Sequence, residues 1–175
     1  MSRLLLRNDR PDRSGRRKRG GMTLRLTGTV ALMAPAVPVM GTAPASAGPG
    51  GIRIYTGTGL NHPSGIAAGA DGALWAANNE DDSIGRISTT GVVTNYTDPT
   101  MNGPLYIASG SDGTMWFTNN AGHSIGRITT AGVVSDFTDS TMKQPGAITP
   151  GPDGALWFIN GDNSIGRITK PGVVS

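Results

Sequence analysis

Cysteine is absent from all 175 residues of the chain. This absence excludes disulfide bridges, zinc sites built on thiolates and cysteine nucleophiles. Small exported domains often use disulfides to compensate for a thin core, and this chain has none to use. We therefore expect strand pairing and the burial of a repeated apolar set to stabilise the fold.

Hydrophobic residues are also scarce, at 37% of the chain, and no long apolar stretch has the 3.6-residue spacing of a helix. Glycine and proline are abundant by contrast, with 27 and 12 residues. This composition favours short strands joined by tight turns and argues against an array of helices.

The net charge of +3 hides two regions of opposite sign. Residues 1–47 carry nine Lys/Arg and two Asp, whereas residues 48–175 carry six Lys/Arg and ten Asp/Glu. The basicity therefore belongs to residues 1–47, and residues 48–175 contain no basic stripe. We predict no nucleic-acid partner for this protein.

Residues 1–47 carry the pattern of an export signal. A short basic start at Met22 precedes an apolar stretch over residues 26–40 and the small residues Ala45-Ser46-Ala47. The apolar stretch is too short and too rich in proline to span a bilayer as a stable helix. We predict cleavage near Ala47, secretion of the product, and no stable membrane anchor after cleavage.

Two points about the leader stay open. Met1 and Met22 are both candidate starts, because the residues from Met22 onward form a complete signal by themselves. Arg16-Arg17 is a weak match to a twin-arginine signal, so the export route is also open.

A period of 41 residues organises the rest of the chain. The tryptophans lie at Trp75, Trp116 and Trp157, and an Asp-Gly pair precedes each of them at a constant distance. The triplets Ile-Gly-Arg begin at Ile84, Ile125 and Ile165, so the third copy has lost one residue. A period near 40–45 with several short strands in each copy is typical of β-propeller blades.

We therefore predict an all-β fold, a β-propeller of four-stranded blades. Each Asp-Gly pair is expected to form a tight hairpin turn between the first and second strands, because both residues tolerate positive φ. The signal peptide accounts for residues 1–47, and residues 48–175 form three blades. The predicted blades span approximately residues 52–91, 92–132 and 133–175.

The repeated large side chains have a structural interpretation. We expect the tryptophans to pack between blades, and the third strand to pack on both faces. Arg86, Arg127 and Arg167 recur at one position, which indicates a repeated salt bridge or carbonyl contact. Residues 52–56 lie 41 residues before residues 93–97 and resemble them, so we predict an outermost fourth strand there.

Three blades are fewer than the four to eight that close a propeller, and they leave exposed sheet edges and open faces. Three explanations are open. The chain is a fragment of a longer protein, or it is a homo-oligomer that closes its ring, for example as two chains with six blades. Otherwise it has no stable fold.

The repeated phrase is Pro-x-x-Ile, then Asp-Gly-x-x-Trp-Phe-Thr, then Ile-Gly-Arg-Ile-Thr-x-x-Gly. It resembles the repeats of the streptogramin B lyase (virginiamycin B lyase) family over residues 52–175. The resemblance implies a seven-bladed propeller and a magnesium-dependent elimination that opens a cyclic depsipeptide at its ester. It also implies a catalytic histidine directly after the blade-opening proline and a glutamate directly after Trp-Phe-Thr, acting as base and acid.

The three blades do not carry these residues. The positions equivalent to the histidine hold Ser64, Leu105 and Gly146, and those equivalent to the glutamate hold Asn78, Asn119 and Asn160. None of these six side chains can act as a general base near neutral pH. We therefore predict no catalytic residue, and Mg²⁺ is implied by the resemblance alone.

The remaining candidates for chemistry are few. His62 precedes its proline and His123 lies in a middle loop, so both are interpreted as surface residues. The cluster Glu80-Asp81-Asp82 lacks the glycine-rich spacing of a calcium loop, so it is interpreted as a solvated loop. We predict no metal site.

Asn78, Asn119 and Asn160 are the positions at which we predict a polar ligand, on one rim of the ring. Their alternative interpretation is turn-forming asparagine. The sequence favours an exported, non-catalytic module that binds a small molecule or a protein, or a truncated lyase. The alternative is a streptogramin B lyase whose catalytic residues lie outside this chain.

Overall fold

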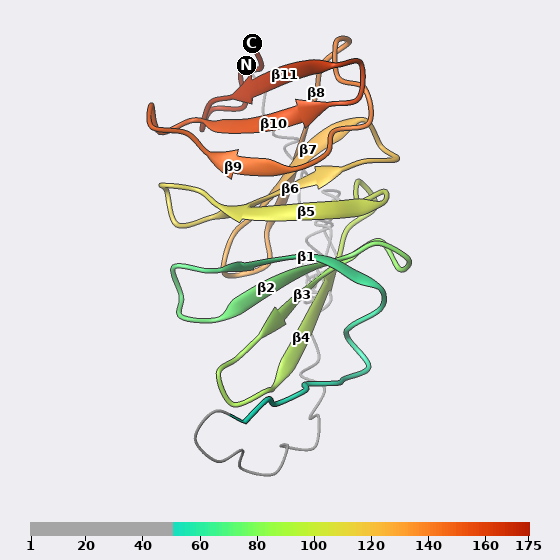
Figure 1. The fold of residues 1–175 in the computed structure, drawn as a ribbon, viewed down its shortest axis with the longest axis vertical. Coiled ribbons are helices and arrows are strands. Elements are labelled where there is room, and N and C mark those ends of the chain that lie inside the picture. Colours follow the sequence, from blue (N-terminus) through green and yellow to red (C-terminus); the bar gives the residue numbers. More distant parts are fainter. Residues whose placement is uncertain (1–50) are drawn as a thin grey trace, which may run out of the picture. The chain divides into compact units, whose positions relative to one another are not determined.

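A computed structural model describes residues 51–175, which form β-strands and no helix (Figure 1). The predicted leader, residues 1–47 with cleavage near Ala47, lies outside the described residues. Within residues 51–175 no helix is long and apolar enough to cross a membrane. The all-β fold predicted from the period is confirmed.

The strands form three antiparallel sheets, one for each copy of the repeat. The first sheet contains β1 (Pro63–Ala68), β2 (Leu74–Asn78), β3 (Ser83–Ile87) and β4 (Val93–Thr97). The second contains β5 (Pro104–Ser109), β6 (Met115–Asn119), β7 (Ser124–Ile128) and β8 (Val134–Thr138). The third contains β9 (Ile148–Pro150), β10 (Leu156–Asn160) and β11 (Ser164–Ile168). Neighbouring strands in each sheet follow one another in the chain, as in a blade.

The Asp-Gly turns form as predicted. Gly72 has a φ of +75°, Gly113 of +79° and Gly154 of +78°, which is the left-handed region where a side chain is unfavourable. In the first sheet the turn is closed by a hydrogen bond from the Gly69 N–H to the Ala73 carbonyl oxygen, 2.8 Å away. These turns set the register of the first two strands next to the turn.

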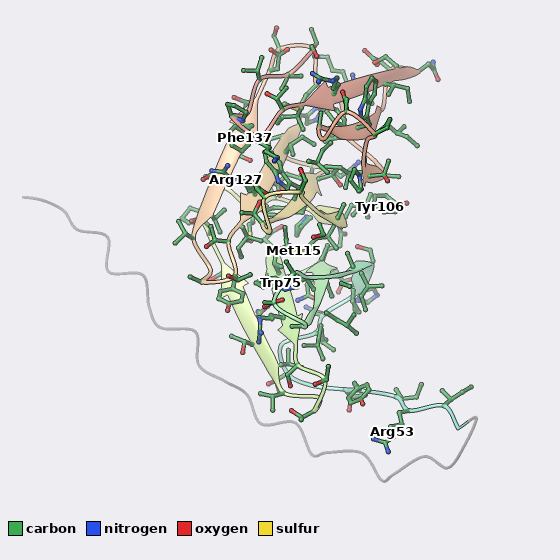
Figure 2. All side chains as sticks on the ribbon, turned by 90° about the vertical axis from the view of Figure 1, so that its left-hand side faces the viewer. Arg53, Trp75, Tyr106, Met115, Arg127 and Phe137 are labelled. Atoms are coloured by element: carbon green, nitrogen blue, oxygen red, sulfur yellow. The ribbon has the colours of Figure 1, made fainter. Side chains whose placement is uncertain are left out.

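The core lies between the sheets. One buried cluster joins Trp75 of the first sheet to Met115 of the second, and both are labelled in Figure 2. Phe117 of the second sheet belongs to the same cluster. A second cluster joins Trp116 of the second sheet to Leu156 and other residues of the third. Burial of tryptophan between blades is thus confirmed for these two, whose exposed fraction is 0%.

The third strand of the first sheet packs on both faces, as predicted. Ile84 belongs to the cluster shared with the second sheet. Ile87 belongs to a different cluster, with Ala76 and Val93, on the other face of the same sheet. Alternate residues of a strand point to opposite faces, so one short strand serves two packing surfaces.

The first strands of the three sheets, β1, β5 and β9, lie side by side (Figure 1). A Cβ added at Gly65 would lie 2.8 Å from the Leu105 carbonyl oxygen and from the Tyr106 Cα, so β1 and β5 approach each other closely. Ser64 reinforces this approach, because its Oγ donates a hydrogen bond to the Leu105 carbonyl oxygen at 2.9 Å. These are the innermost strands of the blades.

The sheets do not coincide with the predicted blades at residues 52–91, 92–132 and 133–175. Each expected division falls in the turn before a fourth strand, but β4 and β8 pair with the third strand of their own sheet. In the third sheet Val174 pairs with Ile168, and Ser175 exchanges backbone hydrogen bonds with Arg167. A fourth strand therefore begins there too.

Residues 52–56 do not form the strand that the repeat predicts. The segment contains no strand, and Ile52 is 86% exposed. Tyr55 nevertheless occupies the expected place, because its ring lies 2.7 Å from the position of a Cβ added at Gly91. Tyr96 lies against Gly132 in the same way. The segment therefore lies where the fourth strand of a preceding sheet would lie, although it is not itself a strand.

Candidate functional site

The three asparagines predicted to bind a ligand end the second strand of each sheet. Asn78 ends β2, Asn119 ends β6 and Asn160 ends β10. Their exposed fractions are 0%, 0% and 6%, so the amide groups lie inside the molecule. A buried amide needs internal hydrogen-bond partners, and each of the three has them.

Asn119 shows what the buried amide does. Its Nδ2 donates a hydrogen bond to the Thr100 carbonyl oxygen at 3.1 Å. Its Oδ1 accepts a hydrogen bond from the Asn102 backbone N–H at 3.3 Å. Both partners lie in the loop that leads into the second sheet, so the amide clamps this loop to the end of β6.

The same asparagine clamp occurs in all three sheets. Its remaining members are Asn78 with Gly59 O (3.0 Å) and Asn61 N (3.3 Å), and Asn160 with Thr141 O (2.9 Å) and Lys143 N (2.7 Å). The donor Nδ2 and the acceptor Oδ1 are both used, which only an amide side chain can do in this geometry. A ligand at these positions would have to displace the clamp, and ligand binding there stays a prediction.

The positions equivalent to the family's histidine lie beside the asparagines. Pro63 pairs with Asn78 and Pro104 with Asn119, so each residue that follows these prolines starts an inner strand next to a clamp. Ser64 is engaged by the carbonyl oxygen of Leu105. Neither the Ser64 side chain nor the Leu105 side chain can transfer a proton as an imidazole would.

Tyr106 breaks the pattern of the inner strands and was not singled out from the sequence. The equivalent residues in the other sheets are the small Gly65 and Ala147. The strand register shifts between Pro104 and Ile107, so Tyr106 sits on a bulge, and its ring is 40% exposed. Figure 2 shows Tyr106 on the opposite side of the sheets from Arg127. Bulges commonly re-aim a side chain beside a binding site.

The arginines, aspartates and tryptophans of the repeat form a second recurrent unit. Asp71 accepts hydrogen bonds from Arg86 Nε at 2.6 Å and from Trp75 Nε1 at 3.2 Å. Arg167 repeats the first bond to Asp153 at 2.7 Å. The predicted salt bridge is thus present in the first and third sheets.

Arg127 makes the carbonyl contact that was predicted as the alternative. Its Nη1 donates to the Lys170 carbonyl oxygen at 3.2 Å, in the following repeat. Its guanidinium also lies 5.5 Å from the ring centroids of Trp116 and Phe137. Figure 2 shows Arg127 beside Phe137. All three arginines cover a tryptophan ring, so their role is structural.

These bonds change the acidity of the aspartates. Hydrogen bonds from Trp157 and Arg167 lower the pKa of Asp153 from 3.8 to about 2. Partial burial raises the pKa of Asp71, but hydrogen bonds from Arg86 and Trp75 outweigh it, so this pKa also lies below its usual value. A general acid needs the opposite shift, so neither carboxyl is suited to donate a proton near neutral pH.

The rim loops tie neighbouring sheets together. Asp82 Oδ1 accepts a hydrogen bond from the Gly103 N–H at 2.7 Å. One repeat later, His123 Nδ1 accepts one from the Gln144 N–H at 3.3 Å. His123 thus lies in an exposed loop as predicted, and its ring contributes to the contact between the second and third repeats.

The described residues do not fit a magnesium site. Within residues 51–175 no group of three His, Cys, Asp or Glu side chains gathers as a metal site would need. His62 instead lies 3.0 Å from Glu80 in an exposed pair. The amide oxygens at the ends of the second strands already accept backbone hydrogen bonds. Mg²⁺ requires several oxygen ligands in octahedral geometry, and these residues do not offer them.

Comparison with known proteins supports the propeller fold. The model of the virginiamycin B lyase family matches residues 49–175. A catalytically inactive virginiamycin B lyase from Staphylococcus aureus with quinupristin is 40% identical, with a TM-score of 0.62, and covers 65% of this chain. A streptogramin B lyase structure matches equally, at 40% identity and a TM-score of 0.62 over 65% of this chain.

A nidogen/laminin complex is similar in fold alone, at 20% identity and a TM-score of 0.60, over 69% of this chain and 49% of that chain. No curated protein matches. The chain spans about 40% of the length of the lyases to which it is similar, 40% of the first and 39% of the second.

Proposed function

The chain belongs to the virginiamycin B lyase family, and we propose that it is an exported, non-catalytic propeller module that binds a ligand at the rim of its inner strands. One observation carries the proposal. The positions equivalent to the family's glutamate hold asparagines whose amides are buried and used as clamps. The blades described here therefore retain the fold at these positions and hold no carboxylate there.

The surroundings of Asn119 are adapted to an amide. Its Nδ2 also donates to Ser124 Oγ at 3.0 Å and to Asp136 Oδ1 at 3.1 Å. A glutamate in its place would bring a second carboxylate towards Asp136 and would lose the donor that Thr100 requires. Placing a glutamate at position 119 would therefore require further substitutions around it.

Tyr106 is the residue that we assign to ligand contact. It is an exposed aromatic side chain on a bulge, next to the start of β5, where the other repeats carry small residues. Aromatic rings contribute large contact areas to binding sites at low conformational cost. The ligand class that fits is a molecule with an apolar or aromatic face, and a cyclic peptide such as quinupristin is the appropriate probe.

The test separates binding from conversion. The purified chain is titrated with quinupristin by calorimetry, and the same mixture with Mg²⁺ is then analysed by mass spectrometry. We expect binding without a linear product, and an affinity about fivefold weaker in Tyr106→Ala, which is a modest hot-spot effect. Val133→Ala changes an exposed side chain of the turn before β8 and serves as the control. Conversion to a linear product, or unchanged affinity in Tyr106→Ala, contradicts the proposal.

Export is tested separately. The full coding sequence is expressed in a secreting host, and the N-terminus of the protein in the medium is sequenced. An N-terminus near Gly48 supports cleavage after Ala47, whereas retention of the leader in cell-associated protein refutes it.

A second candidate function is a streptogramin B lyase whose catalytic residues lie in sequence outside this chain. The 40% identity to the lyases over 40% of their length favours it. Under this candidate the three blades would supply scaffold, and further repeats would supply the histidine and glutamate. A longer transcript that encodes a proline-histidine pair followed by a glutamate fourteen residues later would distinguish it.

A further inference from the structure

The third sheet presents an apolar face that its counterparts bury. Trp157 is 36% exposed, Ile159 52% and Ile165 63%. The equivalent residues of the first sheet are 0% exposed, because the second sheet covers them; they are Trp75, Ala77 and Ile84. Nothing within the described residues covers this face of the third sheet.

The first sheet has the complementary open face. Ile66 is 65% exposed and Leu74 is 45% exposed. Their equivalents in the second sheet are Ile107 and Met115, which are buried against the first sheet at 6% and 0% exposure. A cavity of about 380 Å³ lies on this open face, lined by Ile66, Leu74 and the segment around Tyr55.

We propose that a second copy of the chain docks its first sheet onto the third sheet of the first copy, head to tail. The contact would reproduce an interface that the chain already forms twice, between its first and second and between its second and third sheets. The two open faces carry the same repeat positions as the two sides of those interfaces. This continuity identifies the occupant as another copy of the same repeat.

The aromatic residues on the two faces complete each other. Tyr96 stacks on Trp75 with 5.6 Å between ring centroids, and Phe137 stacks on Trp116 with 5.4 Å. Trp157 has no such ring partner within the described residues. Tyr55 lies against Gly91 as Tyr96 lies against Gly132, so it occupies the place of the fourth-strand ring of a preceding repeat. Within the described residues no tryptophan of a preceding repeat stacks on it. Docking brings Tyr55 of one copy onto Trp157 of the other.

The strands complete each other as well. In the second sheet β8 pairs with all five residues of β7. In the third sheet β10 pairs with one edge of β11 along its whole length. On the other edge only Arg167 and Ile168 are paired, by Ser175 and Val174, so residues 164–166 have no partner on that edge within the described residues. By the 41-residue repeat, residues 54–56 of a second copy match these three positions. The register places Tyr55 opposite Ile165.

An acceptor within the third repeat itself makes this pairing compatible with Ile54. In the second sheet the fourth strand supplies Asp136, which accepts a hydrogen bond from the Asn119 amide. Ile54 at the equivalent position could not do so. In the third sheet the acceptor is Asp162 in the neighbouring loop, 3.1 Å from Asn160 Nδ2. The clamp is therefore satisfied before the second copy docks.

A head-to-tail contact either closes into a ring or continues as a chain of copies. Two copies would bring six sheets together, which is within the range of four to eight at which propellers close. Closure also removes both open sheet faces, which would otherwise promote aggregation.

Absence of cysteine allows a direct test by disulfide trapping. The full chain is made as two single variants, Tyr55→Cys and Ile165→Cys, which are mixed and oxidised. We expect a disulfide-linked dimer of the two variants, because directly opposite residues of paired strands lie within disulfide distance. The control mixes Ile165→Cys with Tyr106→Cys, which has the same residue type and similar exposure at 40% against 37%. Equal trapping in both mixtures overturns the proposal.

Solution mass provides an independent test. Light scattering on the full chain is expected to give an oligomer, and Ile159→Glu is expected to weaken its association about tenfold or more, because the carboxylate would be buried in the contact. Val133→Glu is the matched control, since Val133 is 50% exposed and Ile159 52%. Circular dichroism checks that both variants fold. A wild-type monomer, or equal loss of association in both variants, overturns the proposal.

Discussion

Asn119 donates a hydrogen bond to the carbonyl oxygen of Thr100, 3.1 Å away and 19 residues earlier in the chain. The bond is formed by a side chain at the end of a strand and a backbone group in the loop that enters the same sheet. Because it recurs in all three repeats, it explains why an asparagine occupies this position each time. The amide positions each blade's connection to the one before it.

Loss of this clamp is expected to destabilise the fold. Asn119→Ala removes a side chain that is 0% exposed and leaves the Thr100 carbonyl and the Asn102 N–H without their partner. We expect the free energy of unfolding to fall by about 2–4 kcal/mol. Urea unfolding followed by tryptophan fluorescence measures it. Asn102→Ala changes an exposed asparagine in the same loop and should cost much less; equal losses would contradict the clamp.

The glycine of the Ile-Gly-Arg triplet is expected to tolerate alanine in one repeat and not in the next. A Cβ added at Gly126 would lie 2.1 Å from Phe117 Cζ, a distance that neither group can relieve in a buried core. At Gly85 the nearest atoms are 3.2 Å away, because Ala76 replaces the phenylalanine.

We therefore expect Gly126→Ala to cost about 2–4 kcal/mol of folding free energy and Gly85→Ala less than about 1.5 kcal/mol. Thermal and urea unfolding of the two variants gives the comparison directly. Similar losses for both would mean that the phenylalanine does not fill the space over the glycine.

Much of the fold follows from the period alone. Three copies of Asp-Gly, Trp and Ile-Gly-Arg predict the hairpins, the burial of Trp75 and Trp116 and the arginine contacts, because local patterns and repetition suffice for them. The clamp was not predictable, since the partners of Asn119 are backbone groups 17 and 19 residues earlier. Only the three-dimensional path of the loop brings them together.

The candidate binding residue illustrates a second limit. Tyr106 departs from Gly65 and Ala147 at the same repeat position, and that contrast is visible in the sequence. Its exposure depends on the register shift between Pro104 and Ile107, which the sequence does not reveal. Residues 52–56 show the opposite case, in which the sequence predicts an element that does not form. Their similarity to residues 93–97 predicts a strand, but a strand forms only with a partner to pair with.

The aspartate bonds predict a dependence of stability on pH. The folded-state pKa of Asp153 is about 2, below the ordinary value of 3.8. A lowered folded-state pKa stabilises the fold above the unfolded pKa, and this stabilisation is lost as the pH falls through the folded pKa. Asp71 shifts in the same direction. We expect the urea midpoint to change little above pH about 5 and to fall between pH about 4 and about 2.

Asp153→Asn should flatten this decline, because the neutral side chain does not titrate. The comparison is made at a series of pH values with the same urea assay. Glu80→Gln, in an exposed loop, is the control. Parallel pH profiles for Asp153→Asn and wild type would show that the Arg167 and Trp157 bonds do not contribute to acid stability.

The contact between the second and third repeats is expected to accept an aspartate in place of His123. Its Nδ1 accepts the Gln144 N–H bond, and Asp82 accepts the equivalent Gly103 N–H bond one repeat earlier, over a shorter distance of 2.7 Å. Both residues have positive φ, +55° for His123 and +48° for Asp82, a conformation that aspartate tolerates better than alanine. His123→Asp should therefore change the unfolding free energy by less than about 0.5 kcal/mol, whereas His123→Ala should cost about 1 kcal/mol. Amide hydrogen exchange at Gln144 reports the bond itself: it should stay protected in His123→Asp and become faster in His123→Ala. Equal exchange rates in the two variants would show that the ring does not hold the loop.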